Sequence, residues 1–328
     1  MSVDHKYKIC IVSIYFGKLP TSYAAWAYSC SMNPEIDFLL VTDSIRECEY
    51  PNIKIEHMYF DQLVELARQK ISKDIVLDNP YKLCDYKPVF GVILEEYLRG
   101  YDYWAHCDID MVFGDLMKFF REYQLYNYDK FLPLGHLSLY RNTPEVNNRF
   151  LLPANISNPH CVTFYTSQHL AYDEKDGINE LYRQYGFSAF NEILFADIDY
   201  RHSRMTLARS KIGNHFPLPL HQEELFLWEN GRSFHVVYSN GKIEKKEVIY
   251  IHFQKRGLKD CVNNYRELDS FIICPDGIKE LNCDISREVI LKHNPYRGKL
   301  KELYEIRKFE YLTRIYRYTR KLRKMILK

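Results

Sequence analysis

The stretch YDYWAHCDIDMVFGD, residues 101–115, decides the fold expected for this chain. Two aspartates, Asp108 and Asp110, stand one residue apart at the end of an aromatic and apolar run. In an extended segment alternate residues project to the same side, so both carboxylates can face one cation while Ile109 points into the core. Carboxylate oxygens suit Mg²⁺ or Mn²⁺, which keep open positions for the phosphate oxygens of a substrate. A pair of solvated loop aspartates is the alternative.

The residues up to the two aspartates predict an alternation of strands and helices. Strands are expected at 7–15, 36–41, 53–57 and 103–107, and helices at 22–32, 61–73 and 89–99. This order predicts an α/β protein with a parallel, nucleotide-binding sheet whose ligands lie at the carboxyl ends of the strands. Neither G-x-G-x-x-G nor a Walker loop follows the first strand, which argues against dinucleotide-binding and P-loop folds.

The pattern changes after the two aspartates. Residues 135–141 look like a strand, 150–166 are irregular, and 186–199 mix a helical and a strand-like piece. Asn230-Gly231 predicts the turn of a hairpin over 225–238, and a further strand is expected at 247–253. Because no linker rich in Pro, Gly or Ser interrupts the body, we expect one catalytic domain over residues 1–290 and a tail over 291–328.

Composition excludes several classes of protein. A formal net charge of +2 gives no reason to expect binding to nucleic acid. Nine scattered cysteines without a C-x-x-C pair indicate a reducing compartment. The N-terminus lacks the pattern of a signal peptide, and no apolar run approaches the roughly 20 residues of a membrane span. We therefore expect a cytoplasmic protein.

The last thirty residues, 299–328, are strongly basic. Their apolar residues recur at helical spacing, which predicts a basic amphipathic helix. Such a helix is typical of binding to a membrane surface, here the inner face of the cell membrane. The alternatives are packing on the catalytic domain or contact with a second copy in a homo-oligomer.

Six segments together carry a family resemblance. They resemble an uncharacterised bacterial family of GT-A type glycosyltransferases found among capsule and surface-polysaccharide enzymes. The segments are YFGKLPTSY at 15–23, SCSMNPEIDFLLVTD at 29–43, YKLCDYKPVFG at 81–91, HCDIDMVFGDL at 106–116, GHLSLYRN at 135–142 and YIHFQKR at 250–256. The resemblance implies a GT-A fold in a single Rossmann-like domain, a nucleotide-sugar donor and a divalent metal (Mn²⁺ or Mg²⁺) on Asp108 and Asp110. It names neither the sugar nor the acceptor, for which we expect a saccharide that a lipid could carry.

The resemblance also implies roles for single residues on the donor side. His252, from a late strand, would complete the metal shell, and Lys255 and Arg256 would reach diphosphate oxygens. The expected donor is a UDP-sugar, and its other contacts are expected from Tyr15, Phe16, Gly17, Asp43, Lys82, Asp85 and Lys87. Without the resemblance, Tyr15 and Phe16 are core residues, Asp43 belongs to a turn, and His252 bonds to backbone. His106 is a competing metal ligand for which burial in the core is expected.

The acceptor side would be bordered by residues 135–142, with His136 and Arg141 as polar contacts. An inverting enzyme needs a carboxylate that removes the acceptor proton. Asp173 and Glu174 are the first candidates, because they occupy the stretch where GT-A enzymes often supply this base. Glu223 and Glu224 are the second candidates, and surface carboxylates are the alternative for both pairs. A retaining enzyme would need no such base, and the sequence does not distinguish the two.

Two other functions fit parts of the sequence. A sugar-phosphate nucleotidyltransferase shares the α/β sheet and the metal-binding aspartates, but usually has a Gly-rich basic loop after its first strand. A non-catalytic polysaccharide-binding or scaffold protein would keep the aromatic residues without needing Asp108, Asp110 and His252 together. The expected function is metal-dependent transfer of a sugar in the synthesis of a bacterial capsule or lipopolysaccharide.

Overall fold

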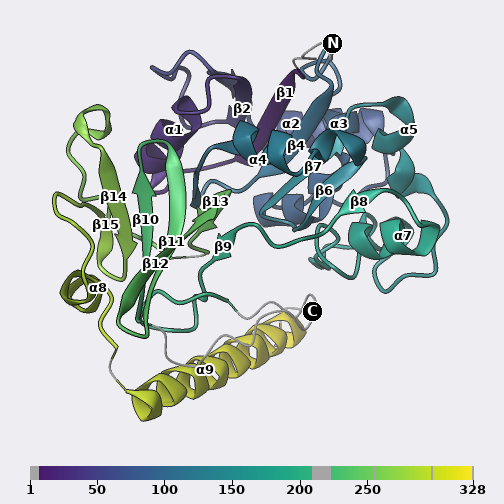
Figure 1. The fold of residues 1–328 in the computed structure, drawn as a ribbon. Helices are drawn as coiled ribbons and strands as arrows, with labels where there is room; N and C mark the ends of the chain where they lie inside the picture. The colour runs from purple at the N-terminus through teal and green to yellow at the C-terminus, as the bar shows by residue number, and fades with distance from the viewer. Residues whose placement is uncertain (1–6, 209–222, 255, 297, 327–328) are drawn as a thin grey trace, which may run out of the picture. The chain divides into compact units, whose positions relative to one another are not determined.

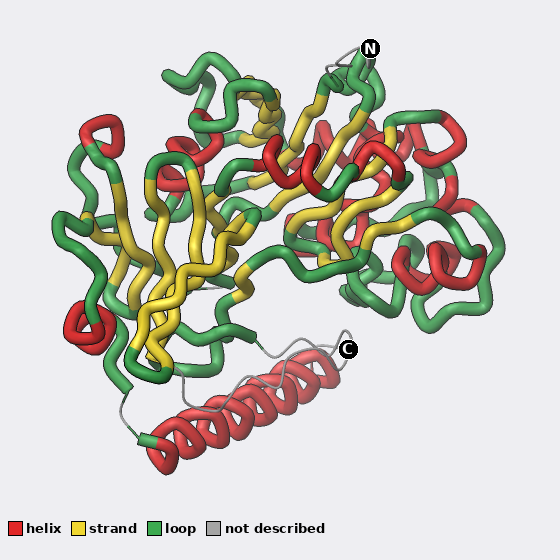
Figure 2. Tube along the Cα trace, in the orientation of Figure 1, coloured by secondary structure: helices red, strands yellow, loops and turns green. Residues whose placement is uncertain are grey.

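The chain consists of two compact units, Met1–Leu194 and Phe195–Lys328. The computed structural model describes residues 7–208, 223–254, 256–296 and 298–326 (Figure 1). Helices and strands alternate in the first unit, whereas strands dominate the second (Figure 2). The protein is therefore of mixed α/β class. The predicted division into a catalytic region, 1–290, and a tail, 291–328, is a division by function and stays a prediction.

The first unit is built on a seven-stranded sheet. Its strand order is β3-β2-β1-β4-β7-β6-β8. The strands are β1 (Ile9–Tyr15), β2 (Ile36–Thr42), β3 (Ile53–His57), β4 (Tyr103–Cys107), β6 (Lys130–Leu134), β7 (Leu137–Arg141) and β8 (Ala189–Phe190). β1 to β4 pair in parallel as predicted, while β7 runs antiparallel to both β4 and β6.

The order of the parallel strands reverses at β1. The chain runs outward from β1 to β2 and β3, then returns to place β4 on the other side of β1, where Val12 pairs with His106. In open α/β sheets ligands bind at such a switch point, outside the carboxyl ends of the strands. The segments that follow β1 and β4 therefore frame the candidate site.

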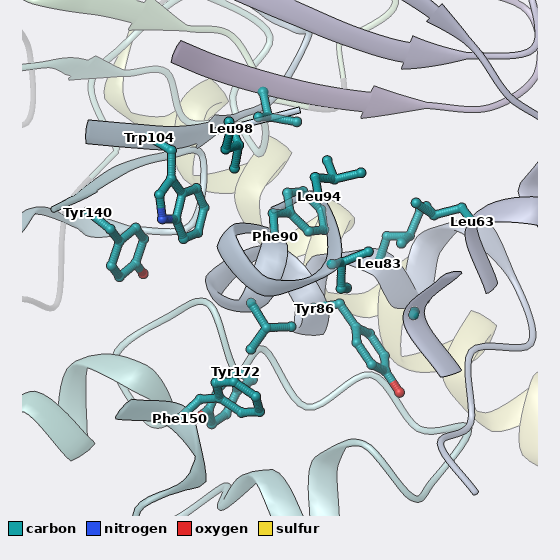
Figure 3. Close-up of a cluster of buried hydrophobic side chains, with 14 of the residues drawn as sticks. Leu63, Leu83, Tyr86, Phe90, Leu94, Leu98, Trp104, Tyr140, Phe150 and Tyr172 are labelled. Carbon is teal, nitrogen blue, oxygen red and sulfur yellow. The ribbon is translucent and has the colours of Figure 1, made fainter. Parts of the chain in front are cut away.

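Aromatic packing holds a helical layer against this sheet (Figure 3). Trp104 of β4 is fully buried and stacks on Tyr140 of β7, with ring centroids 4.8 Å apart. A Cβ at Gly91 would lie 2.4 Å from Trp104 Nε1, so only glycine lets the short helix α3 (Phe90–Ile93) approach the indole this closely. Phe90 and Leu94 belong to the same buried cluster.

The helix predicted over residues 89–99 is shorter and less regular than expected. A 3₁₀ helix, η1 (Pro80–Val89), leads into the single turn of α3, and residues 94–100 continue as turns. Beyond α3 the Leu98 N–H is shared between the carbonyls of Leu94 and Glu95, which is a mixed helical geometry.

The other predicted elements of the first unit are mostly present. α1 (Tyr23–Ser31) and α2 (Phe60–Lys70) agree with the expected helices. The helical piece predicted within 186–199 lies earlier, as α7 (Ile178–Tyr185), because Gly186 adopts φ +65° and ends the helix there. The remaining elements are β5 (Met111–Phe113), α4 (Leu116–Glu122), η2 (Leu125–Asn127), α5 (Pro144–Asn147), η3 (Arg149–Leu151) and α6 (His160–Thr163).

The second unit contains a five-stranded antiparallel sheet of order β12-β11-β10-β14-β15. The predicted hairpin is present, and Asn230 and Gly231 both have positive φ, as the turn between β10 and β11 requires. The predicted strand over 247–253 is two strands, β12 and β13, and β13 pairs in parallel with β9. The elements are β9 (Ala196–Asp197), β10 (Glu223–Glu229), β11 (Arg232–Ser239), β12 (Lys242–Val248), β13 (Tyr250–His252), η4 (Tyr265–Glu267), β14 (Ser270–Cys274), β15 (Gly277–Glu280) and α8 (Arg287–His293).

The second unit ends in the long helix α9 (Lys299–Ile326). It contacts the segment at 200–203: Phe309 packs edge-on against Tyr200, and Glu305 Oε2 accepts a hydrogen bond from the Ser203 N–H. Among the described helices, none combines the length and the apolar character that a membrane span requires.

Candidate functional site

Asp108 and Asp110 directly follow β4, at the switch point of the sheet. The Asp108 N–H donates to the carbonyl of His136 at 2.9 Å, which fixes the backbone where the strand ends. Ile109 is buried, while Asp108 and Asp110 are half-buried, as expected for alternating residues. One carboxylate oxygen of each aspartate lies within 4.8 Å of the other. The two carboxylates therefore converge, although only a metal titration tests whether they hold an ion.

Lys87 provides a positive charge beside Asp108. Its ammonium lies 2.7 Å from Asp108 Oδ1 and 3.4 Å from Asp173 Oδ2, and donates to the carbonyl of Gly135 at 2.9 Å. Burial lowers the pKa of Lys87, but the neighbouring carboxylates outweigh it and hold the pKa well above its ordinary value. Lys87, predicted as a donor contact, thus joins Asp108, a predicted metal ligand, to Asp173, the predicted base.

Asp173 and Glu174 converge on the turn between β6 and β7. Glu174 Oε1 accepts the Gly135 N–H at 3.2 Å. A Cβ at Gly135 would lie 2.2 Å from Asp173 Oδ2, so the Asp173 carboxyl fills space that only glycine leaves open. Burial raises the pKa of Asp173 to about 8, and the Lys87 ammonium partly offsets that rise. A carboxyl with this pKa exchanges its proton close to neutral pH.

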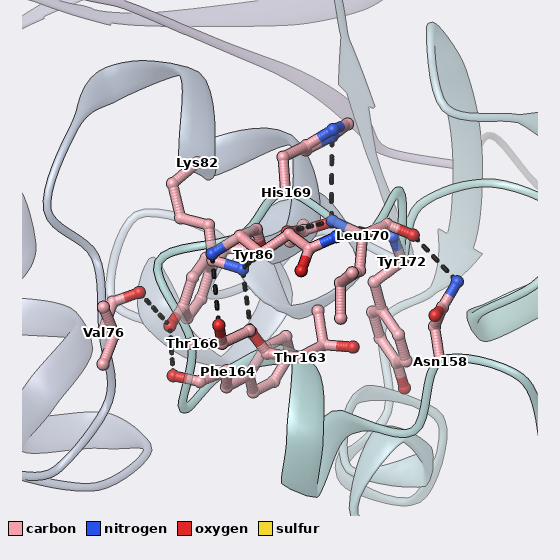
Figure 4. A network of polar contacts seen from close by, with 12 residues as sticks. Val76, Lys82, Tyr86, Asn158, Thr163, Phe164, Thr166, His169, Leu170 and Tyr172 are labelled. Atoms are coloured by element: carbon pink, nitrogen blue, oxygen red, sulfur yellow. Dashed lines mark hydrogen bonds and ion pairs between the residues drawn. The ribbon is translucent and has the colours of Figure 1, made fainter. Parts of the chain in front are cut away.

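Lys82, predicted as a donor contact, lies in a network of buried polar contacts (Figure 4). Asp85, also predicted as a donor contact, belongs to the same network. Both side chains are fully buried and pair at 2.7 Å. Lys82 also donates to the carbonyls of Thr163 and Gln168, and Asp85 accepts the backbone N–H groups of Leu170 and Tyr172. Direct contact with a ligand would require these side chains to leave the network. Their arrangement instead fastens η1 to the segment that leads into Asp173, a positioning role that residue type alone did not reveal.

The segment after β1 meets the end of β2. Gly17, at φ +86°, donates its N–H to Asp43 Oδ1 at 2.8 Å, and the Ser44 hydroxyl donates to the Gly17 carbonyl. Tyr15 and Phe16 are half-buried, and the Phe16 ring packs edge-on against Phe60. Three predicted donor contacts, Phe16, Gly17 and Asp43, are therefore neighbours. Gly17 has open space at its Cβ position, so its backbone angle rather than close packing requires glycine.

His252 lies on β13 in the second unit. Its Nδ1 is 2.8 Å from Asp197 Oδ1, and Gln254 donates to both oxygens of the same carboxylate. A carboxylate on one ring nitrogen orients the imidazole and makes the other nitrogen more basic, which is a common support for a metal-binding histidine. Asp197 was missed by sequence reasoning. The run ADID at 196–199 is its only local signal.

The other predicted residues of the second unit that the structure describes form hydrogen bonds within that unit. Arg256 donates to the carbonyls of Asp199, His202 and Arg204, and its predicted contact with diphosphate stays a prediction. Lys255 lies outside the described residues. The second pair of candidate bases is also occupied: Glu223 forms two hydrogen bonds to Arg287, and the buried Glu224 bonds to His235 and Thr206.

Around β4 and β7, three further residues were singled out from the sequence. His106 is fully buried as expected, and burial lowers its pKa well below the ordinary value. His136 is buried in the β6–β7 turn next to Gly135. Arg141, predicted at the acceptor, pairs with Asp129 at 3.2 Å and lies over the ring of Tyr103.

Lys130 on β6 is a buried cation that the sequence reading missed. It is 1% exposed, its ammonium donates to the carbonyl of Leu132, and Ser138 Oγ lies 3.5 Å away. Burial lowers the pKa of Lys130 to about 7, while the charge of Glu174 acts in the opposite direction. A lysine that opens the otherwise apolar run KFLPL is its signal in the sequence.

Comparisons with known proteins complete the description. No curated protein matches the sequence. Among solved structures, the apo form of mouse xyloside xylosyltransferase 1 is similar, with 8% identity, a TM-score of 0.35, and coverage of 59% of this chain and 88% of that one. A TM-score below 0.5 does not establish a shared fold. The model of a family of unknown function (DUF6625) matches residues 11–282, and the chain belongs to that family.

Proposed function

We propose that the protein is a metal-dependent glycosyltransferase of GT-A type, which moves a sugar from a nucleotide-sugar donor to a saccharide acceptor. The observation that carries the proposal is the convergence of Asp108 and Asp110 after β4, with Lys87 linking Asp108 to the buried Asp173. These groups stand at the switch point of the sheet, where α/β proteins bind nucleotides. A role in capsule or surface-polysaccharide synthesis is what the sequence resemblance implies.

Asp108 and Asp110 would hold the divalent metal. Two half-buried carboxylates whose oxygens lie within 4.8 Å of each other are a hard oxygen donor set, which fits Mn²⁺ or Mg²⁺. When bound, the metal would act as a Lewis acid that neutralises the diphosphate leaving group. His252, in the second unit, keeps its proposed part as a third ligand on sequence grounds. If it is a ligand, His252→Ala weakens metal binding by ~10- to 100-fold.

Lys87 would set the charge of the site. With the Asp108 carboxylate at 2.7 Å and Asp173 at 3.4 Å, its ammonium balances part of the negative charge that two converging aspartates create. A fixed ammonium also orients the Asp108 carboxylate before a ligand arrives. Lys87→Met removes this cation, and we expect weaker donor binding because Asp108 is then held less firmly.

Asp173 would be the general base of an inverting transfer. Its carboxylate would accept the proton of the acceptor hydroxyl while the hydroxyl oxygen attacks the anomeric carbon of the donor sugar and the nucleoside diphosphate leaves. Burial raises the pKa of Asp173, so its carboxylate, once deprotonated, holds a proton more strongly than that of an exposed aspartate. Glu174 would position the turn at Gly135 through the hydrogen bond to its N–H.

The nucleoside of the donor, for which UDP is the first choice, would lie near the turn after β1. Gly17 and Asp43 shape this turn through their 2.8 Å hydrogen bond, and the half-buried Tyr15 and Phe16 offer aromatic surface for a base. This placement follows the rule that ligands bind beyond the carboxyl ends of the strands next to a switch point.

The decisive experiment is a binding and hydrolysis scan. Calorimetry with UDP-, GDP- and CMP-sugars, with and without Mn²⁺, is expected to reveal one nucleotide class that binds only with metal. Slow release of nucleoside diphosphate from that donor then shows transfer to water. Turnover of a sugar phosphate with a nucleoside triphosphate would replace the proposal with a nucleotidyltransferase. Absence of nucleotide binding in every combination would reject enzyme activity at this site.

A further inference from the structure

The last helix, α9, concentrates the positive charge of the chain. Residues 299–328 contain eleven basic and three acidic residues, a formal charge of +8, whereas residues 1–298 carry a formal charge of −6. An anionic surface therefore attracts this helix and repels the remainder of the chain on average. Charge alone does not distinguish a membrane from a nucleic acid or an acidic protein.

The described side chains of α9, between residues 300 and 315, divide into two faces. Glu305 and Phe309, one helical turn apart, contact Ser203 and Tyr200 of the same unit. Leu300, Tyr304, Tyr311 and Ile315 form a second row, which we term the outer stripe, and they are between 42% and 84% exposed. At 100° per residue the outer stripe lies on the side of the helix away from Glu305 and Phe309. The helix is thus docked by one face and presents large apolar side chains on the other.

Exposed basic residues accompany the outer stripe. Arg307, Lys308 and Arg314 are all exposed and lie between its members along the helix. Two tyrosines and two aliphatic side chains in one row, flanked by cations, suit the boundary between lipid headgroups and acyl chains. A nucleic acid would use the cations but not Leu300 and Ile315.

We propose that the outer stripe of α9 is a membrane-binding face, which inserts its apolar side chains into the interface of an anionic lipid bilayer while the flanking cations contact the lipid headgroups. The face is independent of the proposed catalytic site. It holds the protein at a surface and takes no part in chemistry.

Full-length protein in vesicle flotation tests this proposal. Binding is expected to vesicles of phosphatidylcholine mixed with phosphatidylglycerol, to be weaker on phosphatidylcholine alone, and to fall as salt is raised because the charges are exposed. Arg307→Gln with Lys308→Gln is expected to weaken binding about 30-fold, at about fivefold for each cation near an anionic surface. Tyr304→Ser with Ile315→Ser is expected to weaken it at least about tenfold, through lost insertion.

Matched variants separate the membrane face from charge in general. Lys73→Gln with Lys242→Gln removes the same charge at exposed positions outside α9 and is expected to leave flotation unchanged. Thermal unfolding of each variant checks folding, which exposed side chains are expected to preserve. The proposal is overturned if both α9 variants float like the natural protein, or if the control pair loses binding equally. Self-association that depends on the outer stripe, without flotation, would overturn it in favour of a second copy.

Discussion

Two lysine–aspartate pairs take their lysines from the same short stretch, KLCDYK at residues 82–87, and differ in exposure and in their further partners. Lys82 and Asp85 are fully buried, and bonds to backbone groups of residues 163–172 satisfy them. Lys87 and Asp108 are 10% and 30% exposed, and their pair extends to the predicted base, Asp173. One pair therefore fastens the fold, while the other has the access that a binding site needs.

The same two residue types behave differently in these two environments. A buried ion pair is costly to break because the remaining charge has no water to replace its partner. In the second pair Lys87 is buried as well, but the Asp108 carboxylate is 30% exposed and can accept a ligand beside Lys87. Two observations distinguish a positioning residue from a candidate ligand contact: how exposed its side chain is, and which groups its partners contact in turn. Residue type does not distinguish them.

The largest expected effect comes from breaking the buried pair. Lys82→Met leaves the Asp85 carboxylate buried without its cation, and we expect the free energy of unfolding to fall by ~3–5 kcal/mol in denaturant titrations. Lys54→Met, in the exposed pair with Asp37, is the matched control and is expected to cost less than about 1 kcal/mol. Equal costs for the two variants would remove the distinction between the pairs.

Removal of the Asp108 or the Asp110 carboxylate tests whether the second pair belongs to a metal site. Asp108→Asn and Asp110→Asn are each expected to lower metal-dependent donor hydrolysis by about 10²- to 10³-fold, if the metal supplies several kcal/mol to the transition state. Asp102→Asn, at the opposite end of β4, serves as the control, because the Asp102 carboxylate accepts the Lys8 N–H and lies away from Asp108 and Asp110 along the strand. Activity retained in both site variants would end the metal assignment.

A third lysine, Lys130, is also buried, and the pH dependence of stability tests its charge. Lys130 has a pKa of about 7 in the folded protein because burial disfavours its charge, against 10.5 for an ordinary lysine. Between these values the unfolded chain binds the extra proton, so this residue makes stability rise with pH, by up to about 1.4 kcal/mol per pH unit. Lys130→Met is expected to remove that slope between pH 7 and 9 in denaturant titrations. An identical slope in both proteins would mean that Lys130 is charged when folded.

The smallest expected effect on stability comes from Gly135→Ala. The new methyl group meets the Asp173 carboxyl and displaces it from Lys87, at a cost of about 1–3 kcal/mol in unfolding free energy. Activity is expected to fall more than stability, because Asp173 is the proposed base. Gly257→Ala, where the added Cβ meets nothing within 4 Å, is the control. Full activity of Gly135→Ala would exclude Asp173 from the chemistry.

Local patterns in the sequence determined a large part of the first unit. The apolar runs predicted β1 to β4, the Asn-Gly pair predicted the hairpin of the second unit, and the alternation at 108–110 predicted two half-exposed carboxylates around a buried isoleucine. Each of these depends on neighbours within a few residues, where propensity and periodicity act directly. The helix expected at 89–99 is present only as the single turn of α3, and turns follow it over residues 94–100.

Only the tertiary structure decided the partners of the polar side chains. Lys87 meets Asp173 from 86 residues away, because η1 and the segment that contains Asp173 and Glu174 both contact Gly135 in the β6–β7 turn. Asp197 meets His252 because two short strands pair in parallel. Residue type determines which chemistry a side chain is capable of. Burial and the partners brought near by the fold determine the charge, the pKa and the solvent exposure of that side chain. These quantities arise from contacts distant in sequence, which no local pattern encodes.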